Sequence, residues 1–229
     1  MSIAEELRLP KDLRGGDVEM YRHRCELLLE IIRALTSAVD AKDPYTCGHS
    51  ERVARVAVRL AEGLGCDAGT IDSLYLAALL HDVGKIGIDD AILRKMGTLS
   101  DEEYEHIKAH VSIGHRILHE VELKDLLPVV FHHHESWDGG GYPRHLDAQQ
   151  IPLAARIVAV ADAFDAMSSD RPYRKAMPDE TVDRILETGA GLQWDPDVVR
   201  AFLRVRDDIR RTCGNLRQPV DFELTRFHA

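Results

Sequence analysis

The chain has 229 residues, of which 45% are hydrophobic, 30% are charged and only 6% are aromatic. That length is sufficient for one sizeable core, and a core poor in aromatic residues suits packed helices better than a sandwich of sheets. The formal net charge of −10 argues against non-specific binding to DNA, RNA or anionic lipid, because such binding requires a basic face. A small anionic substrate stays compatible with this charge, because bound metal ions can reverse the local field.

The sequence also bears on the compartment of the protein. No apolar run approaches the roughly 20 residues that a membrane span needs, and the amino-terminal segment lacks the apolar stretch of a secretory signal. Scattered thiols without CxxC spacing fit a reducing compartment better than a disulfide framework. We therefore expect a cytoplasmic protein, whose four cysteines are Cys25, Cys47, Cys66 and Cys213.

The first half of the chain reads as helices. Residues 1–17 are polar and contain a proline and two glycines, which predicts a flexible amino-terminal arm. Apolar residues then recur at helical spacing over 18–43, and Pro44 should end this helix because it disfavours helix at the preceding residue. Two further helices are predicted at about 46–64 and 68–82, and the second ends in an apolar run that looks buried on all sides.

The second half continues the helical pattern. Glycines near 84–87 predict a loop, followed by a short turn near 89–94. Ser100 is an expected N-cap with Glu103 three residues on, the capping-box pattern of a helix start. Residues 136–150 contain three consecutive glycines and a proline and should form a long loop. The remaining helices are expected at about 111–120, 124–134, 151–169, 178–189 and 195–209.

These elements predict an all-α fold with one helical domain. We place this domain at residues 18–212, between the arm at 1–17 and an irregular tail at 213–229. The stretch PVDFEL within the tail could be extended. The loop at 136–150 is the one large irregular feature expected inside the domain.

Several carboxylate and imidazole side chains interrupt strongly apolar helices. His81 and Asp82 end the apolar helix predicted at about 68–82, and Asp162 lies inside the run ARIVAVADAFDAM. An ionised carboxylate in such surroundings is costly unless it is paired with a cation or binds a metal. His49 and His110 each share a helical face with apolar residues, so side chains from several helices could converge on one buried point. Imidazole and carboxylate together suit Fe, Mn, Zn or Co better than Ca or Mg.

The ordered motifs of the chain resemble the HD-GYP family, a group within the HD superfamily of metal-dependent phosphohydrolases. The signature HD is followed by Gly84 and Lys85, and HHESWDGGGYP at 133–143 is similar to the family's second signature, HHExxDGxGYP. The resemblance covers about residues 30–205 and implies a single HD-type helical bundle with an extra C-terminal helical part and a long GYP loop. The flanking matches are GHSERVA, LLHDVGKIGI, HVSIG and VADAFDAMSSDRPYRKA.

The same resemblance implies a set of metal ligands. It gives two divalent metal ions, with Fe or Mn favoured and Zn, Co or Ni as alternatives. Some family members have a glutamate four residues before the first ligand histidine, where it helps to hold a third metal; here that position is Tyr45. We therefore expect a two-metal site bridged by Asp82, with the ligands His49, His81, Asp82, His110, His133, His134 and Asp162.

The resemblance also implies a substrate and its binding residues. Lys85 would contact the scissile phosphate, and Tyr142 would line or shape the pocket. Arg171 and Arg174 would hold the other phosphate or a base. The implied reaction is hydrolysis of a cyclic dinucleotide, cyclic di-GMP being favoured, to the linear dinucleotide and more slowly to GMP. A hydroxide between the metals would attack phosphorus, and Asp82 and Lys85 would be the catalytic residues.

Two other functions stay open at this point. One is an HD-type phosphohydrolase that acts on another nucleotide. The other is a non-catalytic module that senses the dinucleotide or docks on a diguanylate cyclase (GGDEF) domain through the GYP loop. The first helix, 18–42, could pair with a second copy to give a homodimer, although its heptad pattern is weak.

Several polar residues near the motifs have less specific interpretations. His132 is expected to be structural, and His115 with His119 is expected to form a solvated or helix-packing pair. Glu135 and Asp138 stay undecided between orienting a ligand and being solvated charges.

Overall fold

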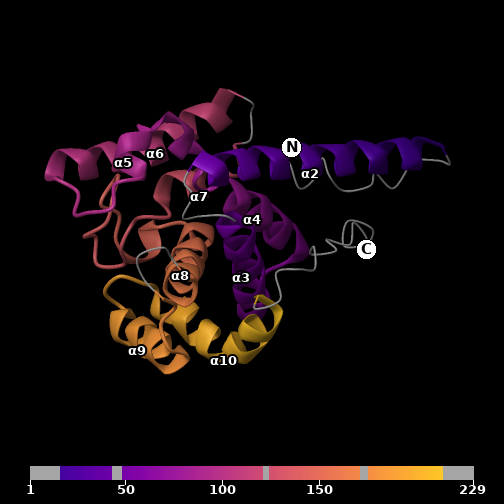
Figure 1. The fold of residues 1–229 in the computed structure, drawn as a ribbon. Coiled ribbons are helices and arrows are strands. Elements are labelled where there is room, and N and C mark those ends of the chain that lie inside the picture. The colour runs from indigo at the N-terminus through magenta and orange to yellow at the C-terminus, as the bar shows by residue number, and fades with distance from the viewer. Residues whose placement is uncertain (1–15, 43–47, 121–123, 171–174, 214–229) are drawn as a thin grey trace.

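Helices make up every regular element of the part of the chain that the computed structural model describes, which is residues 16–42, 48–120, 124–170 and 175–213 (Figure 1). No strand occurs within these ranges, which confirms the all-α expectation. The α-helices are α2 (Gly16–Lys42), α3 (His49–Leu64), α4 (Ala68–Leu80), α5 (Asp90–Leu93), α6 (Asp101–Glu120), α7 (Leu127–His132), α8 (Leu153–Ser168), α9 (Asp179–Gly189) and α10 (Pro196–Cys213). Two 3-10 turns, η1 (Val83–Gly87) and η2 (Ala148–Gln150), lie between them.

The centre of the bundle is made by α3, α4 and α8. The apolar stripe of α3, which includes Val53, Val56 and Leu60, is completely buried, and α3 packs against α4, α8 and α10. The apolar run at the end of α4 is buried on all sides, as its composition predicts. The central helices therefore form one continuous core beneath the segments that carry the histidines.

The remaining helices cover two opposite ends of this core. α9 and α10 close the lower end and form the extra C-terminal part, whereas η1, α6 and α7 lie at the upper end (Figure 1). α2 crosses the upper end and projects beyond the bundle (Figure 1). One face of α2 is buried against the bundle through Leu29, Ile32 and Val39, and its outward face is exposed at Met20, Leu27 and Ile31.

The turn after α4 differs from the sequence expectation. The helix ends at Leu80 rather than Asp82, and residues 83–87 form the 3-10 turn η1 rather than a loop. The physical reason is a close approach between backbones, because a Cβ atom on Gly84 would lie 1.9 Å from the carbonyl oxygen of His110. The tight turn lets η1 lie directly against α6.

Two other helix boundaries also differ. The expected separate helix at 111–120 is the second half of α6, because the face of Ile107, His110 and Gly114 continues without a breaker. The helix expected at 124–134 is only α7, which begins at Leu127 with Pro128 in its first turn. Proline is tolerated in the first turn but not in a helix interior, so the helix starts next to it.

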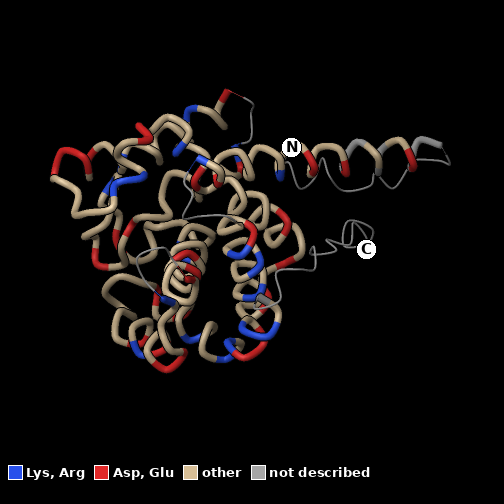
Figure 2. Tube along the Cα trace, in the orientation of Figure 1, with Lys and Arg blue, Asp and Glu red and all other residues tan. Residues whose placement is uncertain are grey.

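The helix start predicted at Ser100 agrees with the structure. The capping box at the start of α6 is present: the backbone N–H of Glu103 donates to Oγ of Ser100 at 3.2 Å, and that of Ser100 donates to Oε2 of Glu103 at 2.7 Å. Basic and acidic residues are both spread over the described part of the chain and do not gather into one basic and one acidic face (Figure 2). None of the helices in this part of the chain combines the length and hydropathy required of a membrane span.

The ends of the chain are only partly described. α2 begins at Gly16, two residues before the expected start. The rest of the predicted arm, the predicted PVDFEL segment and Tyr45 lie outside the described residues.

Candidate metal centre

The expected ligands converge at the upper end of the core. His49 begins α3, His81 and Asp82 form the turn between α4 and η1, and His110 lies in the middle of α6. The ligand atoms fall into two groups, and the atoms of each group lie within 4.8 Å of one another. Asp82 belongs to both groups, which are His49, His81 and Asp82, and Asp82, His110, His133 and His134.

Asp82 lies at the centre of this arrangement. Its Oδ2 atom is 3.4 Å from Nε2 of His81 and 3.9 Å from Nε2 of His49, and its Oδ1 atom is 3.4 Å from Nε2 of His110. The charges of Lys85 and of the neighbouring imidazoles outweigh burial and hold the pKa of Asp82 well below its ordinary value. The carboxylate is therefore ionised and offers one oxygen to each group.

The imidazole rings are oriented by backbone carbonyl groups. Nδ1 of His81 donates to the oxygen of Ala78 at 2.7 Å, and Nδ1 of His110 donates to that of Ile107 at 2.8 Å. Nδ1 of His133 lies 3.1 Å from the oxygens of both Val129 and Val130. Since a carbonyl oxygen only accepts, each Nδ1 carries a proton, and each Nε2 faces the centre of the site, where the neutral imidazole would offer its lone pair to a metal.

One buried atom tests whether this site fits a metal. Nε2 of His81 is buried and makes no hydrogen bond within the described part of the chain, although Oδ2 of Asp82 lies 3.4 Å away. A buried polar atom without a hydrogen bond is costly, and a divalent cation would satisfy it. Imidazole nitrogens with a shared carboxylate are a donor set for transition metals, so the residues present fit the metal that the sequence implies.

Burial also keeps the imidazoles of the second group neutral. It lowers the pKa of His134 to about 4, and the charge of His110 acts in the same direction. Burial lowers the pKa of His110 and, with the charge of His134, that of His133. Neutral imidazole is the form that binds a metal, so this group is ready to do so at neutral pH.

Asp162 lies beside the two groups rather than within either. Its Oδ1 atom is 3.2 Å from Nε2 of His49. This contact and the charge of His49 outweigh burial and lower the pKa of Asp162. The structure thus brings Asp162 to the expected site through His49, while the other six residues supply the two groups.

The sequence reasoning did not select Asp165, which is buried one turn after Asp162 on α8. Its Oδ2 atom accepts from Nδ1 of His49 at 2.7 Å, and the guanidinium of Arg52 donates to both of its oxygens at 2.5 and 3.0 Å. Burial opposes protonation of His49, but Asp162 and Asp165 together raise its pKa to about 9. Asp165 lies in the same apolar run as Asp162, so the cost of an unpaired buried carboxylate could have identified it from the sequence.

The expected substrate residues are partly described. Nζ of Lys85 lies 2.7 Å from Oδ2 of Asp82, which places its charge beside both groups. The ring of Tyr142 stacks on that of His134, with centroids 4.9 Å apart, and thereby borders the second group. Arg171 and Arg174 lie outside the described residues.

Glu135, whose role the sequence left undecided, lies directly before the GYP loop, residues 136–150, and binds its backbone. It is 4% exposed and accepts hydrogen bonds from the backbone N–H groups of Arg144 and Leu146 at 2.7 and 3.1 Å. Nδ1 of His132 lies 3.4 Å from the same carboxylate. Asp138, by contrast, is exposed and accepts from the backbone of Gly140. The buried carboxylate therefore shapes the loop that carries Tyr142.

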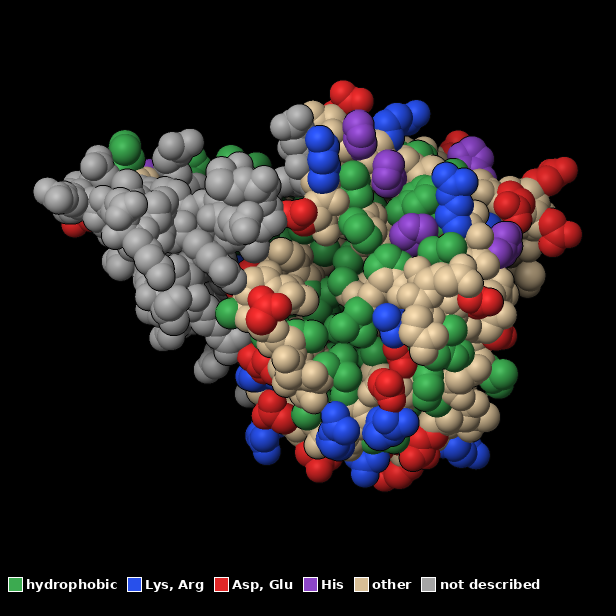
Figure 3. Space-filling view, turned by 180° about the vertical axis from the view of Figure 1, so that it is seen from behind, with side chains coloured by type: hydrophobic (Ala, Val, Ile, Leu, Met, Phe, Trp, Pro, Cys, Tyr) green, Lys and Arg blue, Asp and Glu red, His purple; other side chains and the backbone are tan. Residues whose placement is uncertain are grey.

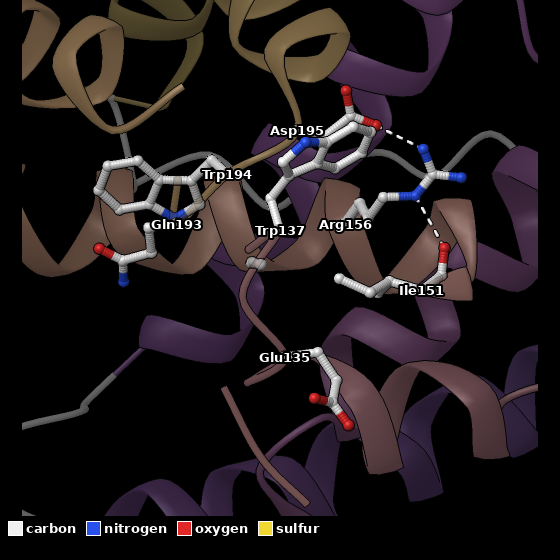
Figure 4. A pocket seen from close by; sticks show the side chains of 8 residues that line it. Glu135, Trp137, Ile151, Arg156, Gln193, Trp194 and Asp195 are labelled. Carbon is white, nitrogen blue, oxygen red and sulfur yellow. Dashed lines mark hydrogen bonds and ion pairs between the residues drawn. The ribbon is translucent and has the colours of Figure 1, made fainter. Parts of the chain in front are cut away.

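The residues around a small pocket between the loop and the C-terminal helices attach both ends of the loop to the rest of the domain (Figure 4). The guanidinium of Arg156 on α8 donates to the oxygen of Ile151 at 2.8 Å and to the carboxylate of Asp195 at 2.5 Å. It also lies 5.7 Å from the centre of the Trp137 ring. The backbone of Trp137 donates in turn to Gln193 at 3.1 Å, which ties the loop to the α9–α10 connection.

Histidines outside the ligand set lie at the surface of α6. The rings of His115 and His119 stack with centroids 6.0 Å apart, and His115 also contacts Phe131 at 4.9 Å. These contacts agree with a helix-packing pair. The rear view shows histidine side chains gathered on the upper part of the molecule, among basic residues (Figure 3).

Comparison with known proteins identifies the family. A family model described as HD domain matches residues 33–198. A cyclic di-GMP phosphodiesterase of Thermotoga maritima is 41% identical over 194 residues, which are 83% of this chain and 53% of the relative. A 3′3′-cGAMP-specific phosphodiesterase 3 of Vibrio cholerae is 42% identical over 173 residues, which are 75% of this chain and 38% of the relative.

The fold comparison agrees with these matches. A crystal structure of a cyclic GMP-AMP-specific phosphodiesterase of Vibrio cholerae superposes with a TM-score of 0.65 at 18% identity, covering 87% of this chain and 52% of that one. The chain thus spans about half the length, or less, of the relatives that it matches. With the HD turn, the GYP loop and the histidine cluster in place, the chain belongs to the HD-domain family and is of the HD-GYP type.

Proposed function

We propose that this chain is a metal-dependent phosphodiesterase that hydrolyses a cyclic dinucleotide to the linear dinucleotide. The observation that carries the proposal is the carboxylate of Asp82, which is shared by two groups of ligand atoms. A shared carboxylate between two such groups suits a pair of divalent ions. Its relatives named as cyclic di-GMP and 3′3′-cGAMP phosphodiesterases support the substrate class.

The proposed cofactor is a pair of divalent ions. The donor set suits Fe, Mn, Zn or Co, and the resemblance to the HD-GYP family favours Fe or Mn among them. When bound, they supply a water of lowered pKa and neutralise charge on the phosphoryl oxygens. The proposed ligands are the six residues of the two groups together with Asp162, which contacts His49.

The chain's own residues have separate parts in this proposal. The ammonium of Lys85, beside Asp82, stabilises charge that develops on a phosphoryl oxygen. Tyr142, stacked on His134, forms a wall against which the substrate is oriented. Arg171 and Arg174 stay our prediction for the second phosphate or a base, and residues 18–212 stay our prediction for the catalytic domain.

The deciding experiment measures hydrolysis of cyclic di-GMP by the purified protein. We would assay it with anaerobic Fe(II), with Mn(II) and after chelation, beside Asp82→Ala. Metal-dependent formation of the linear dinucleotide, absent from the chelated and variant samples, is the expected result. The exposed His119→Ala variant is the matched control and should retain activity, since it lies on α6 but outside both groups.

Cyclic GMP-AMP is the second substrate to test, because the relative with 42% identity is named for it. Turnover of neither cyclic dinucleotide, by protein that carries metal, would favour another phosphoester substrate. A protein that binds the dinucleotide but no metal would instead favour the sensing module. Docking of a diguanylate cyclase (GGDEF) domain on the GYP loop and formation of a homodimer stay predictions.

A further inference from the structure

The last turns of α2 contact the segments on both sides of the metal centre. Asp40 is 7% exposed, and its Oδ2 atom accepts from the backbone N–H of Gly48 at 2.9 Å. Its Oδ1 atom accepts from the hydroxyl of Ser50 at 3.1 Å. Gly48 and Ser50 flank His49, so one buried carboxylate holds the chain immediately before and after a proposed ligand.

Gly48 has a constrained position in this contact. Its φ of 69° lies in the left-handed region that favours glycine. It is also the N-cap of α3 and offers no side chain of its own to the first turn. The acceptor that holds the start of the helix is therefore supplied from α2, by Asp40.

Lys42 makes the corresponding contacts on the other side. Its Nζ atom donates to the carbonyl oxygens of Ile86 and Ile88, both at 2.6 Å, and lies 3.5 Å from Oδ1 of Asp90. Ile86 follows Lys85 within η1, the turn that begins directly after Asp82. Six residues before Lys42 on the same helix, the hydroxyl of Thr36 donates to the carbonyl oxygen of Leu79 at 3.3 Å.

The same helix end thus connects two ligand-bearing segments that are otherwise separate in the chain. His49 and Asp82 come from these two segments, and Nε2 of the first is 3.9 Å from Oδ2 of the second. Metal affinity depends on ligand spacing of this kind to within about 0.5 Å. A shift of α2 at residues 40–42 would change this spacing without touching a ligand.

We propose that Asp40 and Lys42 are positioning residues that set the spacing of His49 from the His81–Asp82 turn, and that α2 is thereby coupled to metal affinity. This inference rests on the metal centre proposed above. The exposed outer part of α2 and its buried inner part belong to one continuous helix, which ends at Lys42.

Asp40→Asn and Lys42→Met test this coupling, because both keep the size of the side chain. Asn at 40 cannot accept through its amide nitrogen, and Met at 42 cannot donate to the carbonyl groups of η1. We would titrate the chelated proteins with Mn(II) and record the rise in Tm that Mn(II) produces. We expect about tenfold weaker Mn(II) binding and a smaller metal-induced rise in Tm, as for other residues that support ligands.

Two controls match these changes in chemistry. Asp67→Asn alters the N-cap carboxylate of α4, which accepts from Thr70, and Lys95→Met removes an exposed ion pair with Glu103. Both should bind Mn(II) as the wild type does, whatever they do to Tm.

A purely structural role has a different result. It would lower Tm equally with and without Mn(II) in Asp40→Asn and Lys42→Met and leave Mn(II) affinity unchanged, which would overturn the inference alone. A wild-type protein that binds no Mn(II) or Fe(II) would overturn the metal centre and the inference together.

Discussion

Asp165 shows how a carboxylate outside the ligand set can govern a ligand. Its carboxylate accepts hydrogen bonds from Nδ1 of His49, from the guanidinium of Arg52 and from the hydroxyl of Ser169, the last at 3.2 Å. The ring of His49 can therefore rotate only if these contacts break. We therefore propose that Asp165 positions His49 and is not itself a metal ligand.

Asp165→Asn should weaken metal binding while the protein stays folded. The amide keeps the size of the carboxylate but replaces an acceptor by a donor, which opposes Nδ1–H of His49 or Arg52. The expected loss of Mn(II) affinity is about 10–100-fold, as for other partners of ligand histidines. Titration of the chelated protein measures it, and Ser169→Ala, which removes only one contact, is the control. An unchanged affinity would show that His49 is oriented by other groups.

The two groups of ligands predict different metal contents for single variants. His134→Ala removes a member of one group only, so this variant should retain the ion held by the group of His49 and His81. Asp82→Ala removes the shared member and should lose both ions. Elemental analysis of metal per chain after desalting distinguishes these results. Equal metal loss in both variants would contradict the division into two groups.

Some of these residues could be predicted from the sequence and some could not. The ligand histidines interrupt apolar patterns and lie in ordered motifs, which made them visible. Asp40 has no such signal, because its importance comes from Gly48 and Ser50, which fold back onto it. Asp165 could have been recognised, but the sequence does not reveal that Arg52 and His49 share it.

At the scale of the elements, the positions of most long helices could be predicted from the sequence, whereas the turn after α4 could not. Apolar spacing and caps determine the long helices, so α3, α8 and α10 agree with expectation apart from their end residues. The 3-10 turn η1 depends on a tertiary contact, the approach of Gly84 to His110, that no local pattern encodes. The start of α7 was missed although Pro128 marks it.

Gly84→Ala should strongly destabilise the protein. A Cβ atom would lie 1.9 Å from the oxygen of His110 and 2.5 Å from the nitrogen of Gly114, and both are backbone atoms that cannot rotate away. The expected loss of unfolding free energy is about 3 kcal/mol or more, the upper range for overpacking. Urea unfolding measures it. Gly97→Ala, where nothing lies within 4 Å, is the control and should change stability little.

The GYP loop should depend on the buried carboxylate of Glu135. In Glu135→Ala the partly buried N–H groups of Arg144 and Leu146 lose their acceptor, which costs about 1 kcal/mol for each hydrogen bond. Because this loop carries Tyr142, we expect KM for the cyclic dinucleotide to rise more than kcat falls. Steady-state kinetics and urea unfolding measure the two effects, and the exposed Asp138→Ala is the matched control. A fall in kcat alone would place the defect at the metals instead.

At the scale of the whole molecule, the same helices carry residues of the candidate metal centre and of the hydrophobic core. His49, His81 and Asp82 lie at the ends of α3 and α4, and Asp162 lies within α8. The buried apolar residues of the same three helices make the core, which α9 and α10 close at its lower end (Figure 1). The stability of the protein therefore depends on the protonation of groups that also serve the site.

Acid should destabilise the metal-free protein. Burial lowers the pKa of His134 to about 4 and also lowers the pKa values of His110 and His133 below their ordinary value of 6.5. Below about pH 6.5 these imidazoles bind protons in the unfolded chain but stay neutral in the folded protein. Their contribution to the free energy of unfolding therefore decreases as pH falls toward 4. Urea midpoints of chelated protein at pH 7 and pH 5 measure this, and His134→Gln should show a weaker dependence. Because His49, whose pKa is raised, acts in the opposite direction over this range, the comparison with His134→Gln is decisive: an equal pH dependence in the variant and the wild type would contradict the burial of His134.

The hydrogen bonds of His49 have a consequence for how protons are exchanged when metal enters. His110, His133 and His134 are neutral at pH 7, so a cation bound by them displaces no imidazole proton. His49 has a pKa of about 9 because Asp162 and Asp165 favour its charged form, so a cation at its Nε2 must release a proton to the buffer. Uptake on the His49 side should therefore strengthen between pH 7 and 9, whereas uptake on the His134 side should not change. One shared carboxylate would thus join two sites that respond differently to alkalinity.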